Sequence, residues 1–182
     1  MSEPVEPSVY GQAVDGLIRG IRARLTPALT EELRTLGLDL TRPLLPLYPQ
    51  KTWFAVLHAA ARHGWPGVGE DQALFELGRA VFHGFSLTMV GRAILKMLVL
   101  LGPRRSLGRL RASFRTADTY TESTLVERSP TEHEVWLNQP TFNPNYVRGI
   151  LMGMLEVTRA GSPQVTVLGR DERGVTYLVR WS

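Results

Sequence analysis

The chain contains no cysteine among its 182 residues. Disulfide bridges, thiolate metal sites and cysteine nucleophiles are therefore excluded. Proteins of a reducing compartment need no disulfides, so we expect a cytoplasmic protein. Lysine is scarce as well, since it occurs only at positions 51 and 96 and arginine supplies the other basic charges. The formal net charge of +4 is spread over the whole chain and is weak evidence for nucleic-acid binding.

Long apolar runs are also missing. The most apolar stretch, residues 90–101, is interrupted by Arg92 and Lys96 and is shorter than the roughly 20 residues that a bilayer requires. Residues 1–7 are acidic and have no basic segment followed by an apolar one, so no secretory signal is predicted. We expect a soluble protein without a membrane span. Residues 1–8 are predicted to form a disordered acidic tail, and residues 9–182 a single domain.

Recognisable catalytic motifs are absent too. Residues 83–88 (HGFSLT) superficially resemble a nucleophile elbow, but the second glycine of G-x-S-x-G is missing and the segment joins two predicted helices. Ser86 or Thr88 as a helix N-cap is the simpler interpretation. Residues 67–69 (GVG) lack the later glycine of a dinucleotide fingerprint, and nothing matches a Walker motif. No nucleophile–base pair can be assembled, so we predict that the chain is not an enzyme.

The histidines at positions 58, 63, 83 and 133 show no metal-binding pattern. His58 and His63 are five residues apart, which separates them by about 140° around a helix. His133 lies between two glutamates, but neighbours in a strand point to opposite faces. We predict neither a metal site nor a cofactor, and we expect the histidines to be exposed to solvent or hydrogen-bonded once.

Helical periodicity dominates the first part of the chain. The segment 87–101 is apolar around most of its circumference, so we expect it to be the central helix of the core and to stop at Gly102-Pro103. Other helices are predicted over residues 10–25, from Thr30 to Gly37, from Thr52 to about His63 and from Glu70 to about Gly84, with an extended proline-containing arm at 38–49.

From Ser113 onward the pattern changes to alternation. Strands are predicted at 120–127 and 134–138 with a turn between them, and again at 164–168 and 175–181. Asn143-Pro144 is a strong helix start, and that helix is predicted to reach Arg159. Short turns between strands imply an antiparallel sheet. The predicted fold class is α+β, an N-terminal helical bundle packed on an antiparallel sheet, with a hairpin–helix–hairpin C-terminal part.

The most charge-biased stretch lies around the end of the predicted helix 87–101. No acidic residue occurs from Gly102 to Ala117. Cations at this position stabilise a helix C-terminus and increase solubility, which is the simpler interpretation. The alternative is that they bind an anionic group or an acidic protein partner. Nucleic acid is a further alternative, but any affinity for DNA is expected to be non-specific and to fall with salt, because it would come from counterion release. A platform that stacks single-stranded bases is not expected, because Phe114 is the only aromatic residue among the cations. The arginines proposed for anion or partner contact are Arg104, Arg105, Arg109 and Arg111.

Gly149 and Gly153 lie four residues apart, on one face of the helix that follows Asn143. Each costs about 1 kcal/mol of helix propensity relative to alanine. Close approach of the backbone to the sheet or to another helix explains this cost best. A ligand lying against the bare surface is the alternative.

Short segments spread over nearly the whole chain, from Tyr10 to Trp181, resemble a paralogous family that is expanded in the myxobacteria and has no established activity. The resemblance implies a domain type more than a function. The segments that carry it are 9–11 (VYG), 16–17 (GL), 37–40 (GLDL), 77–79 (LGR), 82–85 (FHGF), Thr88, 91–92 (GR), 101–105 (LGPRR), 120–122 (YTE), Tyr146, 149–151 (GIL), 176–177 (TY) and Trp181.

The order of helix bundle, hairpin, glycine-containing helix and hairpin resembles more distantly the ligand-binding domain of the TRAPP, vinyl-reductase-like and heme-NO-binding group. That resemblance implies an apolar-ligand site between helices and sheet, or a dimeric scaffold. The sequence lacks the cysteines with which vinyl-reductase-like domains often bind metal. Residues 120–124 (YTEST) also do not match the tyrosine-serine-arginine motif of the heme sensors. Neither metal nor heme is therefore expected here.

These observations predict a non-enzymatic sensor or adaptor that binds a small apolar ligand or a protein partner. The alternative is a dimeric protein-interaction scaffold with a dry core. A homodimer is expected because a small domain has limited means to cover the helix 87–101. The residues expected to contact a ligand are Phe82, Phe85, Met89, Tyr120, Gly149 and Gly153.

Overall fold

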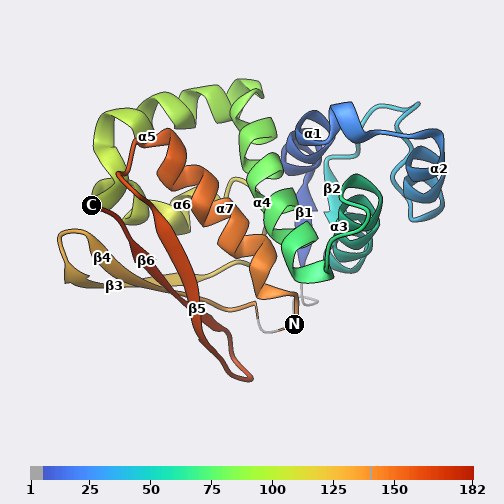
Figure 1. Ribbon diagram of the computed structural model, residues 1–182. Coiled ribbons are helices and arrows are strands. Elements are labelled where there is room, and N and C mark those ends of the chain that lie inside the picture. The colour runs from blue at the N-terminus through green and yellow to red at the C-terminus, as the bar shows by residue number, and fades with distance from the viewer. Residues whose placement is uncertain (1–5, 140) are drawn as a thin grey trace, which may run out of the picture.

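The computed structural model describes residues 6–139 and 141–182 of the chain (Figure 1). Helices make up most of the N-terminal part, and the larger sheet forms in the C-terminal part, as the sequence predicted. The elements are β1 (Ser8–Tyr10), α1 (Gly11–Gly20), the 3-10 helix η1 (Arg22–Arg24), α2 (Pro27–Thr35), β2 (Leu47–Pro49), α3 (Gln50–Gly64), α4 (Glu70–Ser86), α5 (Met89–Leu107), α6 (Leu110–Phe114), β3 (Ser123–Ser129), β4 (Glu132–Leu137), α7 (Pro144–Val157), β5 (Gln164–Arg170) and β6 (Val175–Arg180).

Two antiparallel hairpins form a four-stranded sheet in the order β3-β4-β6-β5, and α7 lies across one face of this sheet (Figure 1). Alternate residues of the two central strands point toward α7 and are buried, for example Val135 and Tyr177. The Tyr177 hydroxyl donates a hydrogen bond of 3.2 Å to the Pro144 carbonyl, which ties β6 to the start of α7. The predicted α+β class and the hairpin–helix–hairpin order are therefore confirmed.

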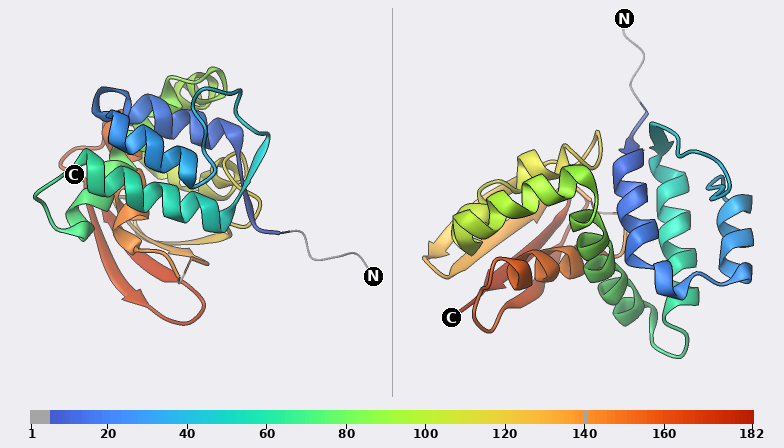
Figure 2. Two further views of the ribbon diagram at one scale, coloured as in Figure 1. Left: turned by 90° about the vertical axis from the view of Figure 1, so that its right-hand side faces the viewer. Right: turned by 90° about the horizontal axis from the view of Figure 1, so that it is seen from above.

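The central helix of the molecule is α4, which packs against α7 on one side and α1 on the other (Figures 1 and 2). Glycines bring the backbones into contact at both crossings. A Cβ atom at Gly149 of α7 would overlap the Phe75 carbonyl oxygen, and one at Gly84 of α4 would overlap the Gly16 carbonyl oxygen. The close approach predicted for Gly149 is thus confirmed, with α4 rather than the sheet as its partner.

The prediction that residues 87–101 form the central core helix is wrong. In α5 only Gly91, Leu98, Ser106 and Leu107 are buried, whereas the Leu100 side chain is 86% exposed. The glycines give α4 the central place, because they let it contact two helices at backbone distance, and α5 is left at the edge. The predicted stop at Gly102 is confirmed as a break, since its φ of 71° departs from helical values before Pro103 restarts the helix.

No single helix within the described residues is both long enough and apolar enough to cross a membrane. The pair α4 and α5 satisfies length and composition together, but the two helices are bent by 100° relative to each other.

The segment that precedes the first helix is more ordered than predicted. Ser8 begins β1, which pairs with β2 at the end of the extended arm, and the Pro7 carbonyl accepts a hydrogen bond of 2.8 Å from the Gln50 amide. The predicted disordered tail of residues 1–8 is therefore wrong for its last residues, and residues 1–5 lie outside the described residues.

Several predicted element boundaries shift because a stronger cap lies nearby. The Thr26 side chain caps α2, which starts at Pro27 instead of Thr30. Strand β3 starts at Ser123 instead of Tyr120. The Asp118 carboxylate accepts hydrogen bonds from the Tyr120 amide at 3.0 Å and the Thr121 amide at 2.6 Å, and these bonds hold the segment in a turn. Thr88 caps α5 as predicted, with its hydroxyl accepting a bond of 2.9 Å from the Gly91 amide.

The backbone contact between α4 and α7 leads to a direct test. Gly149→Ala places a methyl group against the Phe75 carbonyl, so the variant should lose about 1–3 kcal/mol of unfolding free energy. Gly169→Ala is the matched control, because nothing lies within 4 Å of a Cβ at that position. Thermal or urea denaturation measures both variants. Equal stabilities would show that the two helices do not touch at Gly149.

Candidate functional site

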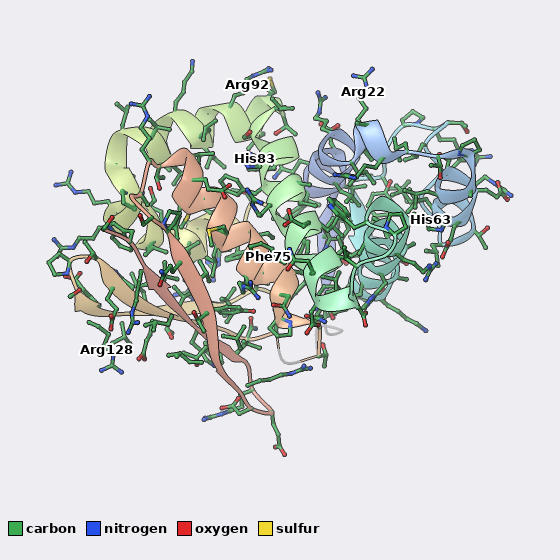
Figure 3. All side chains as sticks on the ribbon, viewed as in Figure 1. Arg22, His63, Phe75, His83, Arg92 and Arg128 are labelled. Atoms are coloured by element: carbon green, nitrogen blue, oxygen red, sulfur yellow. The ribbon has the colours of Figure 1, made fainter. Side chains whose placement is uncertain are left out.

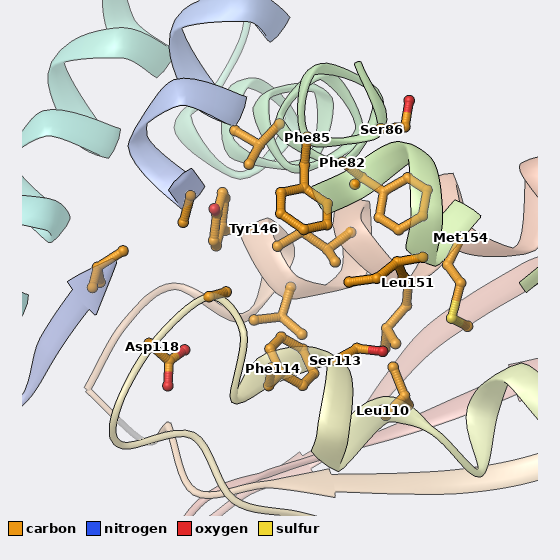
Figure 4. Close-up of a pocket in the computed structure, with 18 of the residues that line it drawn as sticks. Phe82, Phe85, Ser86, Leu110, Ser113, Phe114, Asp118, Tyr146, Leu151 and Met154 are labelled. Atoms are coloured by element: carbon orange, nitrogen blue, oxygen red, sulfur yellow. The ribbon is translucent and has the colours of Figure 1, made fainter. Parts of the chain in front are cut away.

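An apolar cavity of about 120 Å³ lies between the helices (Figure 4). Its walls come from β1, α1, α3, α4, α5, α6, α7 and the loops after α6 and β4, and no residue of the four-stranded sheet lines it. A cavity between helix and sheet was expected, so its position among helices is a correction. The aromatic wall residues are Trp53, Phe54, Phe82, Phe85, Phe114, Tyr120 and Tyr146.

Tyr146 supplies a polar group in this mainly apolar wall. Its side chain is 6% exposed, and burial raises the pKa of its hydroxyl well above 10, so the hydroxyl is neutral and able to donate a hydrogen bond at physiological pH. The structure gives that hydroxyl no hydrogen-bond partner among the described residues. A neutral hydroxyl in a cavity wall is able to donate a hydrogen bond to a ligand or a water molecule that carries an acceptor.

Asp118 and Tyr120 line the same cavity as Tyr146. Their negative charges add to the rise that burial causes in the pKa of Tyr146. The Asp118 carboxylate accepts bonds from the Thr121 amide at 2.6 Å and the Thr121 hydroxyl at 2.7 Å. Burial raises the pKa of Asp118, and these hydrogen bonds oppose the rise without cancelling it. Asp118 thus holds the turn that places Tyr120 in the cavity wall, where burial raises the pKa of the Tyr120 hydroxyl.

The residues expected to contact a ligand divide into two groups. Phe82, Phe85 and Tyr120 line the cavity. Met89 does not line it and is 79% exposed on α5. Gly149 and Gly153 face α4 instead, where a Cβ at position 153 would lie 3.1 Å from the Phe82 ring. The sequence did not predict the cavity residues on α5 and α6, nor Tyr146. Helical periodicity was the only signal for these residues.

The predicted arginine cluster is largely neutralised by glutamates around β3. Arg104 pairs with Glu127 at 2.7 Å, and Arg111 pairs with Glu122 at 2.8 Å. Arg105 and Arg109 are exposed and form no ion pair within the described residues. Contact of the four arginines with an anion or a partner stays a prediction.

The structure brings no three histidine or acidic side chains together as a metal site within the described residues. His58 pairs with Glu70 at 2.9 Å and His63 with Glu32 at 2.8 Å. His133 contradicts the expected exposure. It is 0% exposed, stacks on Trp181 and leaves both ring nitrogens without a hydrogen-bond partner.

The sequence matches, over residues 8–182, the family described as "Protein of unknown function (DUF2378)". The chain belongs to the DUF2378 family. No curated protein matches this DUF2378 sequence. The predicted expansion of the family in myxobacteria stays a prediction.

The fold of this DUF2378 chain is that of H-NOX domains. An H-NOX protein from S. oneidensis in the Fe(II)NO state shares 11% identity at a TM-score of 0.68, over 95% of this chain and 99% of that chain. An oxygen-binding H-NOX domain related to soluble guanylate cyclases shares 14% identity at a TM-score of 0.64, over 94% of each chain. An unliganded Fe(II) H-NOX protein from K. algicida shares 11% identity at 0.61, over 95% of this chain and 96% of that chain. The predicted likeness to the heme-NO-binding group is confirmed for the fold.

The cavity residues of the DUF2378 chain do not fit heme. Heme iron is usually held by histidine or cysteine, and the heme carboxylates favour arginine. The cavity lining contains no histidine, cysteine, lysine or arginine. The raised pKa of Tyr146 also disfavours the phenolate that would bind iron. A volume of about 120 Å³ is small even for drug-sized ligands, which occupy roughly 300–1,000 Å³.

The buried ring of His133 generates a prediction on pH. Burial lowers its pKa below the usual 6.5, against the opposing effect of Glu127, so the unfolded chain binds the proton more tightly. The stability that depends on the neutral ring is complete above about pH 6.5 and is lost as the pH falls through the folded-state pKa. His133→Phe keeps a ring on Trp181 and should flatten the acid side of a plot of melting temperature against pH.

His83→Gln serves as the control, because the His83 side chain is 49% exposed and loses little hydration on folding. Melting curves between pH 8 and pH 5 separate the variants. A wild type and a His133→Phe variant with parallel acid limbs would contradict this assignment.

Proposed function

We propose that this chain is a non-enzymatic sensor or adaptor domain that binds one small apolar molecule in the cavity between its helices. The observation that carries the proposal is the aromatic-lined cavity between the helices, with Tyr146 in its wall. Apolar walls with a few placed polar groups are typical of ligand sites. The H-NOX structures of similar fold include an oxygen complex and an Fe(II)NO state, and they support a sensor role by fold analogy.

The size of the cavity limits the ligand. An apolar cavity of about 150 Å³ binds benzene or xenon in another protein. The cavity here is of similar size, so a single ring or a short alkyl chain matches it, with an oxygen or nitrogen acceptor opposite Tyr146.

The polar residues of the wall do not form a catalytic set. The Ser86 hydroxyl donates to the His83 carbonyl at 2.6 Å, so no base activates it. Asp118 is engaged by Thr121. A nucleophile needs a base within hydrogen-bonding reach, and the described cavity wall offers none. The proposal therefore assigns binding to this site and no reaction.

A ligand would act first on α5 and α6. These helices close one side of the cavity through Ile94, Leu98 and Phe114, and α5 buries few other residues. An element with few buried contacts shifts at low free-energy cost, so occupancy of the cavity would change how α5 packs. A homodimer and a cytoplasmic location stay predictions within this proposal.

The binding proposal is tested with small apolar probes. Benzene and phenol at millimolar concentration should raise the melting temperature of the wild type. Ser113→Leu fills the cavity from α6 and should abolish both shifts. Ala112→Leu changes the neighbouring exposed residue of the same helix and should keep them. A dry-core scaffold, the alternative function, gives no shift in any variant.

The role of the Tyr146 hydroxyl is tested separately. Tyr146→Phe keeps the ring but removes the donor, so the affinity for phenol should fall about fivefold while that for benzene stays unchanged. Native mass spectrometry of the freshly purified protein provides a second readout. An extra mass that is lost on denaturation supports the proposal, and a mass equal to heme would contradict it.

A further inference from the structure

The outer face of α5 carries an exposed apolar stripe. Met89, Ala93, Lys96 and Leu100 are spaced by four, three and four residues, so they follow one line along the helix. Met89 is 79% exposed and Leu100 is 86% exposed, the two largest values among the exposed large hydrophobic residues of the described chain. Leu87, in the turn before α5, is 56% exposed. Large exposed apolar side chains on one face of a helix, here with Lys96 between them, indicate an interaction surface.

The charge around this stripe has one sign. Residues 77–117 contain eight arginine and lysine residues and no aspartate or glutamate, whereas the whole chain has a net charge of only +4. The rest of the chain is therefore net acidic. Four of the eight cations pair with glutamates, namely Arg79, Arg104, Arg111 and Arg115. The other four lie on α5 or just after it. Lys96 is part of the stripe and Arg92 lies beside it. Both side chains are exposed and form no ion pair within the described residues.

The position of α5 leaves this face accessible. The helix runs along the edge of the molecule that lies away from the four-stranded sheet, and Arg92 projects from that edge (Figures 1 to 3). Only the opposite side of α5 meets the cavity, through Ile94 and Leu98.

We propose that the outer face of α5, formed by Leu87, Met89, Arg92, Lys96 and Leu100, docks onto an anionic lipid surface. Leucine and methionine side chains enter the boundary between headgroups and acyl chains, and the neighbouring cations bind the lipid phosphates. The long aliphatic stems of Arg92 and Lys96 allow their charged ends to reach the headgroups while the helix lies in the surface.

The mixture of groups favours lipid over other partners. Nucleic acid would use the cations but gain little from Met89 and Leu100. A second copy placed symmetrically on this face would set Arg92 and Lys96 against their own counterparts, with no acidic residue on α5 to pair with them. Anionic lipid is the partner that satisfies both the charge and the apolar groups.

The absence of cysteine makes a site-specific test simple. Leu100→Cys introduces one thiol, and an environment-sensitive fluorophore attached there reports the polarity around α5. Leu168→Cys, at an exposed position on β5, is the matched control. On vesicles of phosphatidylcholine mixed with phosphatidylglycerol, the label at position 100 should shift to shorter wavelength and the label at 168 should not. Phosphatidylcholine alone should give a much weaker effect.

Unlabelled variants complete the experiment in a vesicle flotation assay. Neutralising Arg92 or Lys96 with glutamine should weaken binding about fivefold each, and raising the salt concentration should weaken wild-type binding. Met89→Ser combined with Leu100→Ser should abolish binding without lowering the melting temperature, because both side chains are exposed. Absence of vesicle binding overturns the proposal. So does a dimer that dissociates in the serine variant, or selective binding to DNA with none to lipid.

Discussion

The arrangement of this molecule depends on how closely α4 approaches its two neighbouring helices. At these crossings the contact is between backbones, because Gly149 meets Phe75 on one side and Gly84 meets Gly16 on the other. Helices at such short range need no large side chains between them. The aromatic residues of α4 and α7 are then free to point elsewhere, and several of them line the cavity next to the crossings. A side chain at either crossing would separate the helices and change the cavity together with the core.

The sequence predicted the class of fold but not which helix lies at its centre. Apolar content favoured residues 87–101, whereas the structure gives that place to α4. The glycines of α4, Gly78 and Gly84, allow it to contact its neighbours at backbone distance. Hydropathy measures what a helix could bury, while its neighbours decide what it does bury. His133 shows the opposite case. Residues 133, 135 and 137 lie on the same face of β4, so the buried Val135 and Leu137 already indicate burial of His133. The preference of histidine for water obscured that signal.

The candidate site was predictable only in part for a similar reason. Phe82 and Phe85 are recognisable as core-facing residues of a helix, and Tyr120 as the start of a β-rich segment. Helical periodicity places Tyr146 and the α6 residues on helices, but it does not indicate that tertiary packing brings them to the cavity. The likeness to H-NOX domains, which include a heme protein, shows the fold alone. The described residues that line the cavity here include no histidine or arginine.

The cavity is assembled from segments that span the chain from Val9 to Met154. No partly folded form with those segments apart retains it, so a bound molecule would favour the complete fold over every such form. Occupancy would then slow degradation in the cell, because proteases act on opened chains. The cellular concentration of the protein would follow the supply of its ligand, even without any downstream partner.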